Sequence, residues 1–292
     1  MTKAEGNKAL TRFIDGFNKI RRTLDPDLNP TYEAGAMLAL DQAEVKAAHG
    51  MNPKGSPNSA AVTVKDAHFT VPKQAGWPRS FIADALTNLK SRRTGEYIRW
   101  YLVFSRDSID APWRVVYQAT FVGSKAPEFK MDGGFAEAVP VGGGSGLAVD
   151  PGKLSKTYAD YLNTGKPDVF ASGPNTDRWR TRRAKDANGV GSRILYEDSA
   201  ANFPPVALRT ADGGALVFFA TYYHQQKTVS PGMIITVGPE LRGILKGPMK
   251  KKTTQMAISN VSGQAVKVPA KSAGGKVEFL YRLDAKTSLT AQ

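Results

Sequence analysis

The spacing of apolar residues divides the chain into helical and extended stretches. In residues 3–24, apolar side chains recur every three or four positions, which is typical of an amphipathic helix. Thr2 followed by Glu5 fits a capping box at the start of this helix. A second helix is predicted over residues 32–48, with His49-Gly50 as its end.

From residue 60 onward the pattern changes to strands. Runs dense in β-branched and aromatic residues predict strands at 61–64, 81–83, 97–104 and 113–121. A short polar stretch with Asp107, Asp110 and Pro112 separates the last two, as in a hairpin loop. We therefore expect an antiparallel sheet in the first half of the chain.

The second half repeats the order of helices followed by strands. Asp150-Pro151 predicts an N-capped helix that Gly165 closes, and residues 176–187 predict a short basic helix. Strands are predicted at 193–196, 206–209, 215–223, 232–237, 255–260 and 276–282. The expected class is α+β, with two cone-like units that each pack helices on a curved antiparallel sheet.

The glycine-rich stretch at residues 142–150 is the clearest candidate for a linker. A chain of 292 residues has the size at which one core commonly gives way to two. We expect an N-terminal α+β unit at 1–141, the linker at 142–150 and a basic C-terminal α+β unit at 151–292.

Charge is distributed unevenly between these halves. The net charge is +14; residues 1–150 carry 19 Lys and Arg against 16 Asp and Glu, whereas residues 151–292 carry 21 against 10. Because like charges repel and a fold needs no such excess, the second half predicts an anionic partner. That partner could be an anionic envelope polymer, an anionic lipid surface or an acidic protein, and nucleic acid stays open.

Two basic clusters are the candidate anion-binding residues. The first contains Arg178, Arg180, Arg182, Arg183 and Lys185, and the second contains Lys246, Lys250, Lys251 and Lys252. On a helix, positions 178, 182 and 185 share one side and could follow a row of phosphates. The plainer alternatives are a solvated helix face and a loop whose lysines deter strand pairing.

Catalytic patterns are scarce in this sequence. It has no cysteine, none of the common nucleophile or nucleotide-binding motifs, and three histidines (His49, His68 and His224) without metal-ligand spacing. We expect no catalytic residue, no metal and no cofactor. The enzyme alternative is an isomerase or dehydratase with a pocket in one cone, built from the available polar residues Asp66, Asp84, Tyr117, Tyr223 and His224.

Several stretches carry a family resemblance that covers nearly the whole chain. They are residues 9–13, 18–19, 69–72, 113–116, 175–177, 203–219 and 268–271. These stretches resemble an uncharacterised family of actinobacterial secreted lipoproteins. The resemblance implies export, a lipid anchor on a cysteine upstream of this sequence, and tandem units of the nuclear-transport-factor-two-like (cystatin-like) type.

The sequence therefore favours a non-enzymatic, extracytoplasmic and membrane-anchored binding or scaffold protein of the cell envelope. Its basic C-terminal half would face the anionic partner. A cytoplasmic location stays open, because the residues from Met1 to Glu5 contain no apolar signal core and no apolar run approaches the roughly 20 residues of a membrane span. A nucleic-acid-binding function is the weaker alternative, since Trp179 is the one aromatic residue among the arginines.

Overall fold

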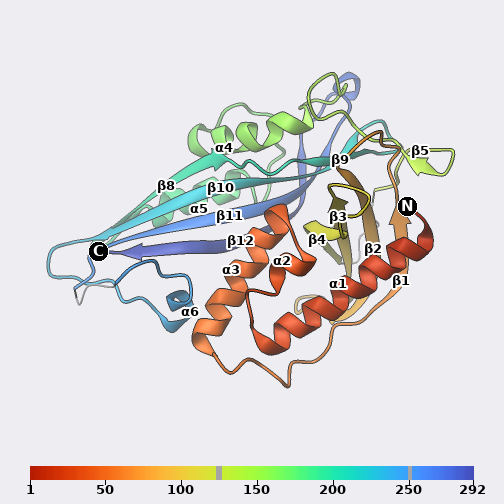
Figure 1. Ribbon diagram of the computed structural model, residues 1–292. Helices are drawn as coiled ribbons and strands as arrows, with labels where there is room; N and C mark the ends of the chain where they lie inside the picture. The colour runs from red at the N-terminus through yellow and green to blue at the C-terminus, as the bar shows by residue number, and fades with distance from the viewer. Residues whose placement is uncertain (123–126, 249–251) are drawn as a thin grey trace.

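Two open antiparallel sheets form the framework of the protein (Figure 1). The structure is a computed structural model that describes residues 1–122, 127–248 and 252–292. The four-stranded sheet contains, in spatial order, β1 (Val64–Thr70), β2 (Arg79–Lys90), β3 (Tyr97–Arg106) and β4 (Arg114–Val122).

The larger sheet has six strands in the order β12-β11-β10-β8-β7, with β9 also paired to β10. Their bounds are β7 (Asn188–Gly189), β8 (Ser192–Ala200), β9 (Val206–Arg209), β10 (Ala215–Val229), β11 (Gln255–Val268) and β12 (Glu278–Ala291). A small hairpin joins β5 (Met131–Asp132) to β6 (Phe135–Ala136). The α+β class expected from the sequence is confirmed.

Helices cover both sheets. They are α1 (Lys3–Thr23), α2 (Asn29–Tyr32), α3 (Gly35–Met51), α4 (Leu154–Thr164), α5 (Asp177–Asp186) and α6 (Pro239–Arg242), with 3₁₀ turns η1 (Pro151–Lys153) and η2 (Lys271–Ala273). Figure 1 shows α1 across the four-stranded sheet and α4 along the six-stranded sheet. Helix α3 contacts β4, β11 and β12, so it lies between the two sheets.

Helix α1 forms as the apolar spacing predicts. The backbone N–H of Glu5 donates to Thr2 Oγ1 (3.2 Å), and the Thr2 N–H donates to Glu5 Oε2 (2.7 Å), which confirms the capping box. The apolar stripe, including Phe13, packs on Phe81 and Phe104 of the four-stranded sheet. One face of that sheet is thereby removed from water.

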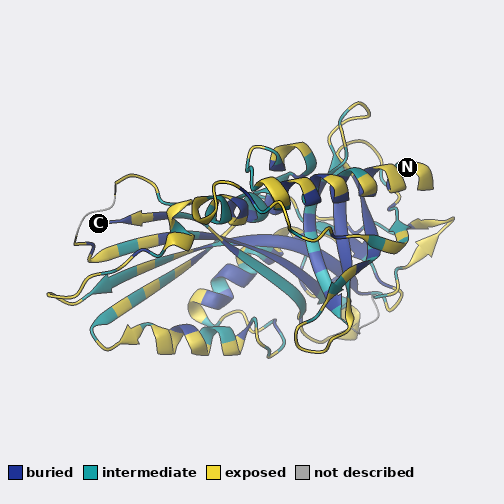
Figure 2. Cartoon of the chain, turned by 90° about the horizontal axis from the view of Figure 1, so that it is seen from below, coloured by how far each residue is buried: buried dark blue, intermediate teal, exposed yellow. Residues whose placement is uncertain are grey.

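The other face of the four-stranded sheet packs against the six-stranded sheet. Tyr101 and Val103 of β3 share a buried apolar cluster with Leu216 and Phe218 of β10 and with Ala36 of α3. Figure 2 shows the resulting dark blue band where the sheets meet. The two halves of the chain therefore contribute to one continuous core.

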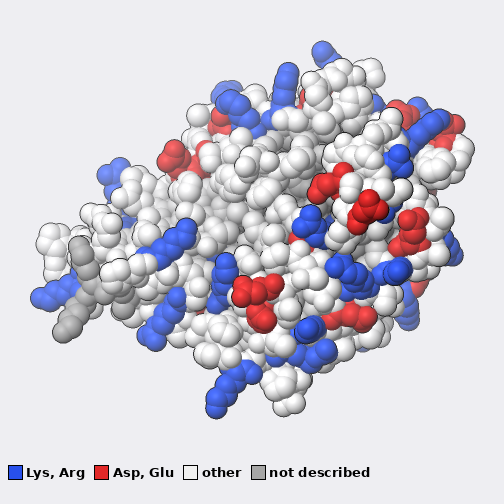
Figure 3. Space-filling view, viewed as in Figure 1, with Lys and Arg blue, Asp and Glu red and all other residues white. Residues whose placement is uncertain are grey.

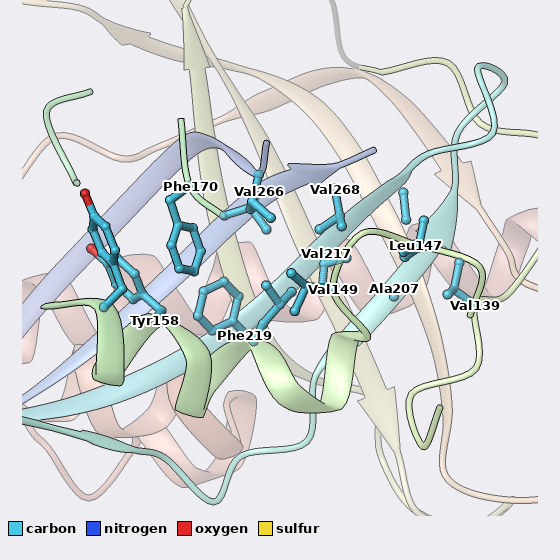
Figure 4. Close-up of a cluster of buried hydrophobic side chains, with 14 of the residues drawn as sticks. Val139, Leu147, Val149, Tyr158, Phe170, Ala207, Val217, Phe219, Val266 and Val268 are labelled. Carbon is cyan, nitrogen blue, oxygen red and sulfur yellow. The ribbon is translucent and has the colours of Figure 1, made fainter. Parts of the chain in front are cut away.

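A second cluster lies under α4. Tyr158 points from the helix onto Phe170 and Phe219, next to Val217 and Val266 of the sheet (Figure 4). The first part of β10, residues 215–223, is thus covered on both faces, which explains why its sequence is almost continuously apolar and not alternating.

The predicted linker lies along the six-stranded sheet. Leu147 forms a bridge with Ala270, and the Ala148 N–H donates to the carbonyl of Pro269 (2.9 Å). Farther upstream, Ala138 forms a bridge with Leu208 of β9. The division into units 1–141 and 151–292 stays a prediction.

Four local predictions are wrong. The segment 61–64 is mostly outside β1, and 232–237 is not a strand because it belongs to the long connection between β10 and β11, where Val237 fills a small core. His49-Gly50 does not end α3, which continues to Met51. The Asp150 carboxylate does not cap the following helix, because it accepts hydrogen bonds from Ser145.

The shared core should make the contact between the sheets essential for stability. We expect Phe218→Ala to lower the free energy of unfolding by about 3–5 kcal/mol, because it opens a cavity at a fully buried position. Urea unfolding followed by circular dichroism measures this loss. Ile109→Ala, at an exposed loop position, is the control and should change stability by less than about 0.5 kcal/mol; similar losses for both would contradict the shared core.

Candidate functional site

The five cations of helix α5 differ in how far their side chains are buried. Its first residue, Asp177, accepts hydrogen bonds from Ser172 Oγ (2.8 Å) and the Gly173 N–H (2.7 Å), which lower the pKa of this carboxyl to about 2 and fix the start of the helix. From this start, the helical turn places Arg178, Arg182 and Lys185 in solvent, leaves Arg180 half-buried and buries Arg183.

Arg183 anchors α5 to the sheet. It forms an ion pair with Asp198 of β8, and the two side chains are 8% and 1% exposed. Its guanidinium lies 4.8 Å from the ring centroid of Tyr196 and 4.9 Å from that of Tyr223. Burial raises the pKa of Asp198 in spite of the adjacent cation. Arg183 therefore belongs to the interior and not to the exposed cationic surface.

A second buried arginine completes this network. Arg282 of β12 lies 4.3 Å from the ring centroid of Trp179, donates to the hydroxyl of Tyr158 (3.0 Å) and pairs with Asp284 (2.9 Å). Trp179 also lies beneath Arg183, at 5.2 Å. Because a buried charge is stable only with partners, these aromatic and acidic neighbours identify Arg183 and Arg282 as structural residues.

The other four cations of α5 have surroundings that differ from those of the buried Arg183. Arg180 donates to the carbonyl of Leu162 (3.3 Å) and so links α5 to α4. By contrast, no ion pair with a carboxylate is found for Arg178, Arg182 or Lys185 among the described residues. These three side chains remain available to an external anion.

The second predicted cluster is described only in part. Lys246 and Lys252 are exposed, and within the described ranges neither has an acidic partner, whereas Lys250 and Lys251 lie outside the described residues. The Lys246 N–H donates to the carbonyl of Leu289 (2.7 Å), which places this lysine beside the end of β12.

Helix α5 contacts β7 and β8 at one edge of the six-stranded sheet, whereas Lys246 lies beside β12 at the other edge. Helix α5 leads into β7, which pairs with the start of β8, and the start of β8 pairs with the end of β10. In the view of Figure 3, Lys and Arg side chains project around the end that holds the C-terminus, while most Asp and Glu side chains lie over the other half. On this face, the end that holds the C-terminus thus carries fewer carboxylates than the other half.

The residues of the enzyme alternative do not meet in one place. Arg99 of β3 brings Asp66 (2.9 Å) and Asp84 together and contacts His68 (3.2 Å); the sequence pattern did not indicate this cluster because the strand register was unknown. Asp66 and His68 are more than half exposed, so water is not excluded.

The remaining three residues of the enzyme alternative lie elsewhere. Tyr117 donates to the carbonyl of Pro204 (2.9 Å), Tyr223 lies under α5, and His224 contacts Ser259 (3.2 Å). The five residues therefore do not form a single catalytic constellation.

A buried carboxyl pair lies where α2 meets α3. Asn29 donates through Nδ2 to Glu33 (3.0 Å) and to Asp41 (2.9 Å). The pKa of Glu33 is raised to about 10, mainly because the group is buried and also because Asp41 is nearby. Burial also raises the pKa of Asp41. Glu33 is therefore protonated at neutral pH, and its hydrogen bond with Asn29 links it to Asp41 at the α2–α3 junction.

Two further observations concern the described ranges of the chain. They contain no group of three or more His, Asp or Glu side chains arranged to hold a metal ion. No helix among the described residues is both long and apolar enough to cross a bilayer.

Fold and site together define an α+β protein with two open sheets and a helix that presents unpaired cations. The chain belongs to the family described as "Domain of unknown function (DUF8094)", whose family model matches residues 1–287. The family expected from the sequence is thus confirmed at the level of uncharacterised lipoprotein relatives.

Three curated relatives are similar to nearly the whole chain. The "Uncharacterized lipoprotein SCO2278" of Streptomyces coelicolor is 37% identical over 98% of this chain and 85% of its own length. An "Uncharacterized lipoprotein" of Streptomyces avermitilis shows the same identity and coverage. The "Uncharacterized lipoprotein SCO6871" of Streptomyces coelicolor is 25% identical over 93% of this chain and 78% of its own length.

The Arg183–Asp198 pair should be structural. We expect Asp198→Asn to lower the free energy of unfolding by about 3–5 kcal/mol, because it leaves the buried Arg183 without its counter-charge. Urea unfolding measures the loss. Glu197→Gln, at the adjacent exposed position, is the control and should stay within about 0.5 kcal/mol of the native protein; an equally small effect of Asp198→Asn would contradict the anchor.

The buried carboxyl pair should make stability depend on pH. Glu33 keeps its proton in the folded protein up to a pH of about 10, whereas in the unfolded chain it loses the proton near pH 4.5. Stability should therefore fall as pH rises through this window, by at most about 1.4 kcal/mol per pH unit from Glu33.

Urea midpoints measured between about pH 5 and pH 9 test this dependence. Glu33→Gln should give a shallower decline than the native protein, and Glu96→Gln, an exposed control, should keep the native slope. A native slope in Glu33→Gln would show that another group causes the dependence.

Proposed function

We propose that this protein is a non-enzymatic binding or scaffold protein of the cell envelope, located outside the cytoplasmic membrane. In this proposal, the exposed cations of its C-terminal half bind the phosphate groups of an anionic surface. The lipoprotein names of its relatives support the location. We also propose that its two halves are cone-like units of the nuclear-transport-factor-two-like type.

The observation that carries the proposal is the exposed row of Arg178, Arg182 and Lys185. Arg178 and Arg182 are four residues apart on a helix, a spacing at which like charges repel and reduce helix stability. Helix α5 is held instead by its buried side, through Arg183 and Trp179. Apart from the contact of Arg182 with the Trp179 ring (5.9 Å), no stabilising contact of this row is found among the described residues, which favours a role in binding.

Phosphate groups fit this surface better than bases do. Arginine and lysine bind phosphate through charge-assisted hydrogen bonds, without the need for a shaped pocket. Base recognition by a single-strand binder needs exposed aromatic rings for stacking. The Trp179 ring already packs against the guanidinium groups of Arg282 and Arg183, which disfavours a nucleic-acid function.

The test compares two variants that lose the same charge. The first combines Arg178→Gln, Arg182→Gln and Lys185→Gln. The second combines Arg92→Gln, Arg93→Gln and Lys54→Gln, three exposed positions of the N-terminal half. Binding to phosphatidylglycerol vesicles and to immobilised polyphosphate, each measured at increasing salt, distinguishes a lipid source of phosphate from a polymer source.

The native protein should bind at least one of these probes and should elute with salt. The α5 variant should lose about 100-fold in affinity, since each cation near a charged surface contributes about 1 kcal/mol. The control variant should lose less than about threefold. Equal losses in both variants, or no binding of the native protein to either probe, would refute the proposed surface.

A further inference from the structure

Two arginines lie directly opposite each other in the four-stranded sheet. Arg79 of β2 and Arg106 of β3 are cross-strand partners in the antiparallel register. Along the strands, they are the next pair after the stacked Phe81 and Phe104 on the same face of the sheet, the one that α1 covers. Like charges at directly opposite positions destabilise a sheet, so this arrangement calls for a compensating anion.

Aromatic rings hold both guanidinium groups in place. The Trp77 ring centroid lies 4.8 Å from Arg79 and 5.3 Å from Arg106, and the Trp113 ring centroid lies 4.4 Å from Arg106. Trp113 is itself fixed by an edge-on contact with Phe81. These contacts orient the arginines without neutralising their charge.

The nearby carboxylates compensate this charge weakly. Glu5 approaches Arg106 at 3.8 Å, near the limit for an ion pair, and its carboxylate also accepts the Thr2 N–H at 2.7 Å. Asp132 lies 3.5 Å from Lys73, and both side chains are largely exposed. In such surroundings an ion pair contributes little.

The two arginines open onto a cavity of about 270 Å³. Lys73, Gln74, Ser80 and Trp113 also line it, and no Asp or Glu is found among its described lining residues. Gln74 and Ser80 satisfy each other through hydrogen bonds of 2.8 and 3.2 Å. The lining thus combines cations, the paired polar groups of Gln74 and Ser80, and apolar or aromatic side chains.

Two residues that line this cavity each have a buried donor atom without an acceptor in the described structure. These atoms are Arg106 Nε and Trp113 Nε1. Buried N–H groups are nearly always hydrogen-bonded, and an orphaned one is unfavourable. Since both orphaned atoms are donors, the missing partner must be an acceptor.

We propose that this cavity binds the oxyanion group of a small molecule, a phosphate or a carboxylate, between Arg79, Arg106 and Trp113. The oxyanion supplies the negative charge that the arginine pair lacks and accepts hydrogen bonds from the orphaned donors. A small rotation of Arg106 brings its donors to the ligand, as interface side chains commonly rotate on binding. The volume is below that of a typical drug-sized site, so the ligand is small.

The test uses Arg79→Gln and Trp113→Phe. The first removes one charge of the pair, and the second removes the indole donor while keeping an aromatic ring. Arg93→Gln, an exposed position on the β2–β3 turn, is the control with the same loss of charge. Circular dichroism establishes that each variant is folded.

Binding is followed by calorimetry and by the nuclear magnetic resonance signal of the Trp113 indole N–H. Among the signals of the four tryptophans, this one is identified because it is missing in Trp113→Phe. Inorganic phosphate, sulfate and citrate are the probes, and they distinguish a phosphate-like oxyanion from a carboxylate. We expect saturable binding of at least one probe, with a shift of the Trp113 resonance.

Arg79→Gln and Trp113→Phe should each weaken this binding by about 10- to 100-fold, and Arg93→Gln should leave it within about twofold. No saturable binding to any probe would overturn the proposal. So would equal weakening by Arg93→Gln, which would indicate a general effect of net charge.

Discussion

The apolar contact between the two sheets is the constraint on which the rest of the structure depends. Burying Phe218 between the sheets, and Phe219 under α4, removes two phenylalanine side chains from water, each worth about 1.5–3 kcal/mol. Helix α3 packs against strands of both sheets, namely β4, β11 and β12. The outer helices α1 and α5 then lie on separate surfaces, each with its own cationic site.

At both sites, the role of an arginine depends on the groups that surround it, because the charge of the side chain is the same in each case. Arg183 and Arg282 each lie against aromatic rings and pair with a carboxylate, which indicates a structural role, although Nε and Nη2 of Arg183 have no acceptor in the described structure. Arg178 and Arg182 pair with no carboxylate among the described residues, although Arg182 lies 5.9 Å from the ring centroid of Trp179. Arg106 is intermediate, since rings hold it while its charge stays weakly compensated.

The spacing of apolar residues predicts the elements that depend on local sequence. It fails where contacts between distant segments determine the structure. Helix α1, its capping box and strand β9 form as predicted, because spacing and caps act over a few residues. Helical spacing places Arg182 and Arg183 on different sides of α5 but cannot show which side is buried, since that depends on Trp179 meeting Arg282 of β12. The Arg99 cluster and the Arg79–Arg106 pair arise from strand register, which the apolar pattern leaves open.

Net charge indicates the C-terminal half of the chain and gives no sign of the cationic cavity in the N-terminal half. The N-terminal half carries nearly equal numbers of cations and anions. Charges are screened over about 8–10 Å, however, so a small ligand responds to the groups that line its site and not to the sum over a domain. Around the Arg106 cavity the described lining contains three cations and no carboxylate. A nearly neutral half can therefore contain a strongly cationic site, and cross-strand register is the feature that creates it.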